Sequence, residues 1–141
     1  MTPDQKDLVQ ASFAKVAPMA DAAATIFYDR LFALDPRLRS LFAKDLTEQR
    51  RKLMAMLGVA VANLHRWEMV APQVRELGQR HRDYGVSPAD YDSVGTALIA
   101  TLEIGLGAEF TPQIRDAWIA CYAVVTAEMK DVADQPAHVA D

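Results

Sequence analysis

The sequence predicts one all-α domain, and three observations lead to this fold class. Apolar residues recur at helical intervals through most of the chain, capping residues, prolines and glycines separate the periodic segments, and no stretch shows the alternation of a β-strand. At 141 residues the chain can bury about two-thirds of its unfolded surface in a single core. We therefore expect six long helices and one short helix joined by connections of a few residues.

The composition excludes several classes of protein. Hydrophobic residues make up 51% of the chain, and no apolar run approaches the roughly 18 residues that cross a bilayer. The net charge is -4, and the dispersed Lys and Arg residues form no basic patch for nucleic acid. The segment Met1 to Gln5 lacks the features of a signal peptide, and the lone Cys121 cannot form an internal disulfide. We therefore expect a cytoplasmic protein that binds neither nucleic acid nor a membrane.

Residues 2–17 should form the first helix. Thr2 and Gln5 have the spacing of a capping box, and Pro3 stands at the first helical position, where the N–H that proline lacks has no helical partner. Apolar residues then continue at helical intervals until Pro18 interrupts the pattern, so the helix should end just before this proline.

The second helix is expected from about residue 21 to residue 34. Its apolar stripe places Tyr28 at the border of the inward face. Asp35-Pro36 ends this helix, because Asp35 can cap a short helical turn that Pro36 opens. That turn should end at Phe42 beside the core, and a loop of a few residues should follow it.

A third long helix should run from Thr47, as its N-cap, to about Trp67. Leu53 and later apolar residues recur along one face of this helix, which therefore turns inward. Gln49 lies one turn before Leu53 on the same face. It is expected to be the polar residue that this helix directs inward, and an exposed position in the first turn is the alternative.

The fourth helix, which starts at Pro72, directs a histidine inward. One helical stripe contains Val74, Leu77, His81 and Tyr84. A buried imidazole needs a partner, so His81 is either a core histidine bonded to backbone carbonyls or a ligand of a cofactor. Gly85 can adopt the left-handed conformation that ends a helix, which places the helix end just past His81.

The fifth helix should be capped by Ser87-Pro88, and Gly105 with Gly107 should end it. Its apolar face carries Tyr91, which periodicity alone makes an ordinary core aromatic. Both ends of this helix are therefore expected from turn residues.

The sixth helix should open at Thr111-Pro112. Its core side should carry Ile114, Trp118, Cys121, Val125 and Met129. Residues 133–141 show no sustained period and are expected to form a disordered tail, so the domain should span residues 1–132.

The order of these segments resembles the globin family, specifically the single-domain bacterial haemoglobins and the globin head of flavohaemoglobins. The resemblance covers Thr2 to about Met129. Its markers are Phe27-Tyr28, Asp35-Pro36 to Leu41-Phe42, Glu48-Gln49 with Leu53, His81 with Tyr84-Gly85-Val86, Tyr91 with Val94-Gly95, and Ala117-Trp118 with Tyr122. The resemblance implies a globin fold, a three-on-three helical sandwich around haem.

The resemblance also implies how the haem, expected to be haem b (iron protoporphyrin IX), is held. His81 would supply the fifth bond to the iron, and Phe42 would pack on the porphyrin. Tyr28, Gln49 and Leu53 would line the opposite face, where a diatomic gas can bind. A core position for Tyr28 that has no contact with a ligand is the alternative.

Further haem contacts are expected from the same resemblance. Lys52 and Arg80 are expected partners of the haem carboxylates, because each is next to a site position, and Arg50, Arg51 and Arg82 are the competing cations. Val86 is expected to contact the haem. In flavohaemoglobins the tyrosine that matches Tyr91 joins the iron-bound histidine and a late glutamate. Counting from Trp118 reaches Ala133 at the glutamate position, although Asp131 and Asp134 flank it, so peroxidase-like activation of oxygen is not expected.

We therefore expect a haem protein that binds dioxygen reversibly, and also NO and CO, and that acts as a monomer or homodimer in storage, scavenging or delivery of oxygen. A nitric oxide dioxygenase is the second hypothesis. It would need a separate reductase, because the sequence shows no Gly-rich nucleotide motif. A haem-based gas sensor and a helical interaction domain without cofactor are the remaining alternatives.

Overall fold

The structure, a computed structural model, describes residues 1–133, and this part of the chain contains helices and no strand. The α-helices are α1 (Pro3–Val16), α2 (Ala20–Leu34), α3 (Thr47–Ala62), α4 (Ala71–Asp83), α5 (Asp90–Leu106) and α6 (Pro112–Ala133). Short 3-10 helices connect them: η1 (Ala17–Met19), η2 (Pro36–Leu41), η3 (Leu64–Met69) and η4 (Gly107–Glu109). The expected all-α class is confirmed, and the expected tail lies outside the described residues except for Ala133.

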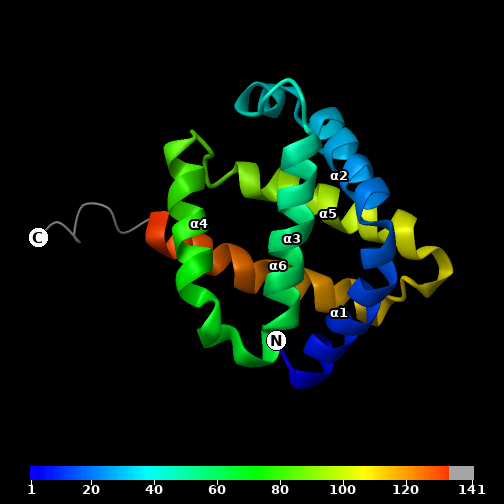
Figure 1. Cartoon of the computed structure of the whole chain (residues 1–141). Coiled ribbons are helices and arrows are strands. Elements are labelled where there is room, and N and C mark those ends of the chain that lie inside the picture. Colours follow the sequence, from blue (N-terminus) through cyan, green and yellow to red (C-terminus); the bar gives the residue numbers. More distant parts are fainter. Residues whose placement is uncertain (134–141) are drawn as a thin grey trace, which may run out of the picture.

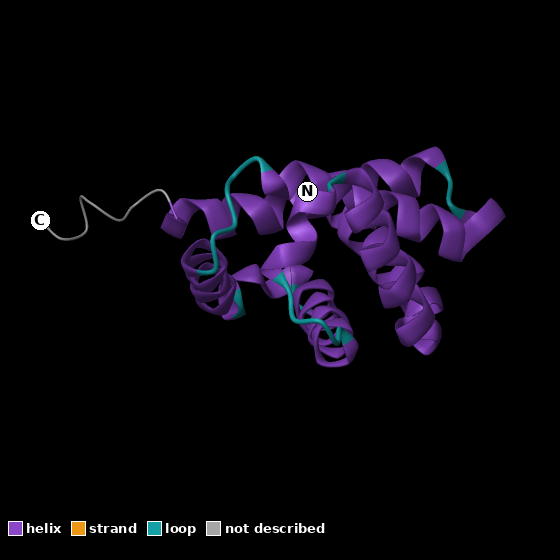
Figure 2. Cartoon of the chain, turned by 90° about the horizontal axis from the view of Figure 1, so that it is seen from above, coloured by secondary structure: helices purple, strands orange, loops and turns teal. Residues whose placement is uncertain are grey.

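The helices cross one another in two layers (Figures 1 and 2). In Figure 1, α3 and α4 run upright in front, while α5 and α6 cross behind them. α4 packs on α6, α2 packs on α5, and α1 packs on α6. Within residues 1–133, α3 and α4 have little direct contact, because α3 instead packs on α1 and α2. α3 and α4 therefore lie side by side with little packing between them.

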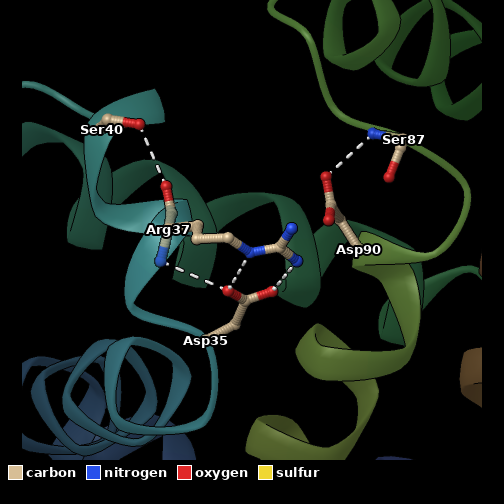
Figure 3. A network of polar contacts seen from close by, with 5 residues as sticks. All are labelled: Asp35, Arg37, Ser40, Ser87 and Asp90. Atoms are coloured by element: carbon tan, nitrogen blue, oxygen red, sulfur yellow. Dashed lines mark hydrogen bonds and ion pairs between the residues drawn. The ribbon is translucent and has the colours of Figure 1, made fainter.

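Local capping chemistry sets several helix starts, as expected. Gln5 N–H donates to Thr2 Oγ1 at 3.1 Å, and Thr2 N–H donates to Gln5 Oε1 at 3.0 Å, which completes the capping box. At η2, Asp35 Oδ1 accepts the backbone N–H of Arg37 at 3.3 Å, and the Asp35 carboxylate also binds the Arg37 guanidinium (Figure 3). Thr111 Oγ1 accepts the Ile114 N–H at the start of α6. These contacts need only residues close in sequence.

Two expected boundaries at α3 are wrong. Thr47 is the first residue of α3 and does not cap it through its side chain; Asp45 Oδ1 instead accepts both the Thr47 N–H at 2.9 Å and its hydroxyl at 2.7 Å. The helix ends at Ala62 and not near Trp67, because the chain kinks there into η3.

The expected ends of α5 also need correction. This helix begins at Asp90, whose Oδ2 accepts the Ser87 N–H at 2.9 Å, so Ser87-Pro88 precedes the helix and does not cap it. Its end is set by Gly107 alone, which has a φ of 57°, whereas Gly105 lies inside the helix. The carboxylate of Asp90 thus fixes the turn that leads into α5 (Figure 3).

The buried apolar side chains form two clusters. The larger extends over α1, α2, α3, α5 and α6 and includes Tyr28, with Phe42 and Leu53 packed at its edge. The smaller joins α4, α5 and α6 through Val74, Tyr91 and Met129. Only Trp67 and Val125 pack against both clusters among the described residues. The helix that carries His81 and the helices that carry Tyr28 and Leu53 therefore pack into different core clusters.

Within residues 1–133 no helix is long and apolar enough to cross a lipid bilayer. This agrees with the lack of a long apolar run in the sequence.

Candidate functional site

His81 lies near the end of α4 with one ring nitrogen occupied. Its Nδ1 hydrogen-bonds the carbonyl oxygen of Leu77, one turn earlier, at 2.8 Å. Because the carbonyl can only accept, Nδ1 carries the proton in this bond, and Nε2 of the neutral ring keeps its lone pair. The ring is only partly buried. A partly covered imidazole with an oriented ring and a free lone pair is suited to binding a metal.

A Schellman motif fixes the backbone just after His81. Gly85 N–H donates to the Arg82 carbonyl at 3.0 Å, Val86 N–H donates to the His81 carbonyl at 3.0 Å, and Gly85 has a φ of 93°. A positive φ is open to glycine at little cost, so the sequence ends the helix where it was expected to end. Tyr84 is 67% exposed, so its expected inward position is wrong, because the chain has already left the helix there.

The Tyr28 phenol on α2 is buried, with 4% of the residue exposed. Burial raises the pKa of Tyr28, and a hydrogen bond from the Gln49 side chain on α3 opposes this rise. This contact places the Gln49 side chain of α3 beside the Tyr28 phenol.

Three aromatic rings surround this phenol. Phe27 meets Tyr28 edge-on at 5.0 Å between ring centroids, and Phe42, which follows η2, does so at 5.5 Å. Phe32 lies 5.9 Å from Tyr28 and 5.6 Å from Phe42. Leu53 packs at the edge of the same core cluster from α3. The structure therefore brings the expected residues Tyr28, Phe42, Gln49 and Leu53 to one side of the molecule.

The other predicted contacts occupy different environments. Lys52 and Arg80 are exposed on α3 and α4, and Val86 is half-buried against the smaller core cluster. Tyr91 is buried in that cluster, and burial raises the pKa of its phenol. In the described residues no hydrogen bond joins Tyr91 to His81; the Tyr91 carbonyl instead accepts the Tyr122 hydroxyl at 2.6 Å. The side chains of Asp131 and Ala133, together with Asp134, lie outside what the structure describes.

Gly78 is a residue of this site that the sequence analysis missed. A Cβ built on Gly78 would lie 2.3 Å from the carbonyl oxygen of Met129 and 2.7 Å from its Cα. Only glycine therefore allows α4 to approach the backbone of α6 this closely, three residues before His81. The available signal was a glycine inside an amphipathic helix, where it costs about 1 kcal/mol relative to alanine.

The residues present fit a flat cofactor that carries a metal. One neutral imidazole nitrogen is available on α4, apolar and aromatic side chains lie on α2, α3 and η2, and these helices pack into different core clusters from α4. A haem between the two groups would contact both and would need a single protein ligand. The exposed cations Lys52 and Arg80 are compatible with the cofactor's carboxylates, which remain at a protein surface.

The protonation of His81 should make the stability of the haem-free protein depend on pH. Burial lowers the pKa of His81 below 6.5, the Arg80 charge adds to this, and the bond to Leu77 opposes it. The unfolded chain therefore binds a proton at a higher pH than the folded protein does. The free energy of unfolding should be retained above about pH 6.5 and fall as the pH decreases through that value toward the folded pKa.

Urea unfolding of the haem-free protein between about pH 7.5 and pH 5.5 measures this effect. His81→Gln should flatten the decrease, because it removes the titrating group. Parallel pH profiles for the variant and the unaltered protein would contradict the assignment of the effect to His81.

Comparison with known proteins gives consistent matches. The model of the family described as Globin matches residues 25–129. Neuroglobin of Tetraodon nigroviridis is 29% identical over 138 residues, covering 88% of this chain and 87% of that protein. Neuroglobin-1 of Oncorhynchus mykiss is 26% identical over an alignment of 143 residues, covering 92% of this chain and 90% of that protein.

A solved structure also matches over the whole chain. It is an engineered carbene transferase, described as a "putative nitric oxide dioxygenase" from Rhodothermus marinus. The TM-score is 0.87 at 22% sequence identity, and the match covers 100% of this chain and 99% of that chain.

Proposed function

The chain belongs to the globin family, and from this premise we propose that it is a haem protein that binds dioxygen reversibly, with His81 as the iron ligand. The observation that carries the proposal is the bond from His81 Nδ1 to the Leu77 carbonyl, which leaves Nε2 available. Membership of the family supports haem binding. The form is proposed as haem b, because the sequence has no Cys-x-x-Cys-His motif to attach haem covalently.

Ferrous haem supplies the iron that binds dioxygen and shifts electron density onto it. Tyr28 and Gln49 would act as the hydrogen-bond donors on the gas-binding side. The Tyr28 hydroxyl and the Gln49 amide lie beside each other, and each can donate to bound dioxygen. Phe42 and Leu53 would exclude water from this side. The arrangement favours tight binding and slow release.

Visible spectra of the ferric, ferrous, oxygenated and carbonyl forms test the proposal directly. A reversible change between ferrous and oxygenated spectra is the expected result. A purified protein that takes up no haem when haem is supplied would contradict the proposed function, and the cofactor-free interaction domain would then be the better hypothesis.

Tyr28→Phe should speed dioxygen dissociation by about tenfold or more. The variant keeps the ring in its aromatic cluster but removes the hydroxyl, and a hydrogen bond to a charged group contributes about 1.5 to 3 kcal/mol. Stopped-flow displacement of dioxygen by CO measures the rate. Tyr84→Phe, at a phenol that is 67% exposed, is the matched control and should leave the rate unchanged. An unchanged rate in Tyr28→Phe would place its hydroxyl away from the gas.

Nitric oxide dioxygenase activity is the second candidate, and the description of the Rhodothermus marinus protein favours it. That reaction would combine dioxygen and nitric oxide into nitrate, and a separate reductase would have to supply one electron for each nitrate formed. The two functions differ in turnover. Nitrate formation over many cycles with a cell reductase and reduced nicotinamide would support the enzyme, whereas one equivalent of nitrate per haem would support the oxygen carrier.

A further inference from the structure

We propose that Arg39 is a positioning residue for the gas-binding side of the site, because its guanidinium fastens the loop that carries Phe42. Arg39 lies on η2, three residues before Phe42. The proposal rests on the proposed haem and dioxygen function. It adds a residue that touches neither the haem nor the gas.

The first observation is a set of bonds from one side chain to three consecutive carbonyls. Arg39 Nη1 donates to the carbonyl oxygens of Phe42 at 3.4 Å and Ala43 at 2.9 Å, and Nη2 donates to that of Lys44 at 2.7 Å. The chain here has left η2, so these carbonyls have lost their helical partners. A planar guanidinium with several fixed N–H groups can satisfy all three together.

The second observation is the contact of the same guanidinium with the aromatic cluster. Arg39 Cζ lies 5.3 Å from the centroid of the Phe32 ring. Phe32 in turn packs on both Phe42 and Tyr28. Cation–π attraction on one side and bonds to the loop backbone on the other therefore link α2 to the segment after η2.

These contacts connect Arg39 both to haem binding, through Phe42, and to gas binding, through Tyr28. The Phe42 backbone is bonded directly, so loss of the guanidinium should let the loop move and weaken the packing of Phe42 on the porphyrin. The position of Phe42 also limits the Tyr28 ring, at 5.5 Å, so the donor to the gas should shift as well. The rate of haem loss and the strength of the hydrogen bond from Tyr28 to the bound gas should thus change together.

Arg39→Gln tests this proposal in the full-length haem-loaded protein. Haem transfer to an excess of apomyoglobin should become on the order of tenfold faster, as expected for lost bonds to a charged group. The C–O stretch of the carbonyl complex should move to higher frequency, because a displaced Tyr28 donates less to the bound gas. Arg39→Lys keeps the charge but loses the planar guanidinium with its several N–H groups. Its haem-transfer rate and C–O frequency should lie between those of the unaltered protein and those of Arg39→Gln.

Arg37→Gln is the matched control. This arginine lies on the same short helix, but its exposed guanidinium binds the Asp35 carboxylate and makes no contact with the loop after η2 that the structure describes (Figure 3). It should leave haem transfer and the C–O stretch unchanged. An equal change in Arg37→Gln would overturn the proposal, because the effect would then belong to any cation of this helix.

The C–O stretch separates positioning from simple loss of stability. A substitution that only destabilises the fold lowers the unfolding temperature and leaves the frequency unchanged, which would overturn the proposal. If Arg39→Gln kept the haem-transfer rate and the C–O frequency of the unaltered protein, the proposal would also be overturned, while the proposed function would stand. Failure of the unaltered protein to take up haem would instead overturn the proposed function.

Discussion

His81→Ala should weaken haem binding by on the order of a hundredfold, or about 2.7 kcal/mol, because the iron loses its protein ligand. Nε2 of His81 is the available donor on α4, since Nδ1 is bonded to the Leu77 carbonyl. Titration of the haem-free variant with haem, followed by the Soret absorbance, measures the loss. Added imidazole should restore part of the spectrum, since it can occupy the space that the side chain leaves.

His65→Ala is the control for this experiment. His65 is exposed on η3 and binds Asp7 on α1 at 2.8 Å, so the variant removes an imidazole that is not proposed to meet the haem. It should bind haem as the unaltered protein does. Normal haem affinity in His81→Ala, or an equal loss in both variants, would remove His81 from the proposed site.

Gly78→Ala should destabilise the protein by about 2 to 3 kcal/mol, because the added Cβ has no space against α6. The atoms it would meet, at 2.3 to 2.8 Å, are all backbone atoms of Met129, so no side chain can turn aside. The helices must separate, and His81 moves with α4. We expect a decrease in unfolding temperature on the order of 10 °C and faster haem loss, measured by thermal unfolding and by haem transfer.

Gly58→Ala is the contrasting substitution. Gly58 lies inside α3, and a Cβ there would meet only the Phe13 ring, at 3.7 Å, which is an ordinary contact. Replacement of a helical glycine at an open position should stabilise the protein by about 0.5 to 1 kcal/mol. If Gly78→Ala proved as harmless as Gly58→Ala, the close crossing of α4 and α6 would not be what places His81.

Much of the fold could be predicted from short stretches of sequence. The Thr2 and Gln5 capping box, the Asp35-Pro36 break and the glycine after α4 all appear where they were expected, because each depends on residues within one helical turn. The errors at the start of α3 and α5 are of the same local kind. At α3 the Asp45 carboxylate accepts the N–H of Thr47, the first residue of the helix, and at α5 the Asp90 carboxylate accepts the N–H of Ser87, which precedes the helix.

The chemistry available to the site was also present in the sequence, whereas its arrangement was not. A histidine on an apolar stripe and a phenol at a helix border could be identified by period alone, and the resemblance assigned their roles. The contact of Gln49 with Tyr28 joins α3 to α2, and the Arg39 guanidinium binds carbonyl groups beyond the end of its helix. Neither contact produces a periodic pattern in the sequence.

By itself the sequence determined the helices, their order and the residue types that each presents to the interior, because periodicity and capping act between neighbours in the chain. Only the tertiary structure decided that Gly78 lets α4 approach α6 and that the core separates into two clusters. Those features follow from the packing of helices distant in sequence, where a single backbone contact sets the distance between elements.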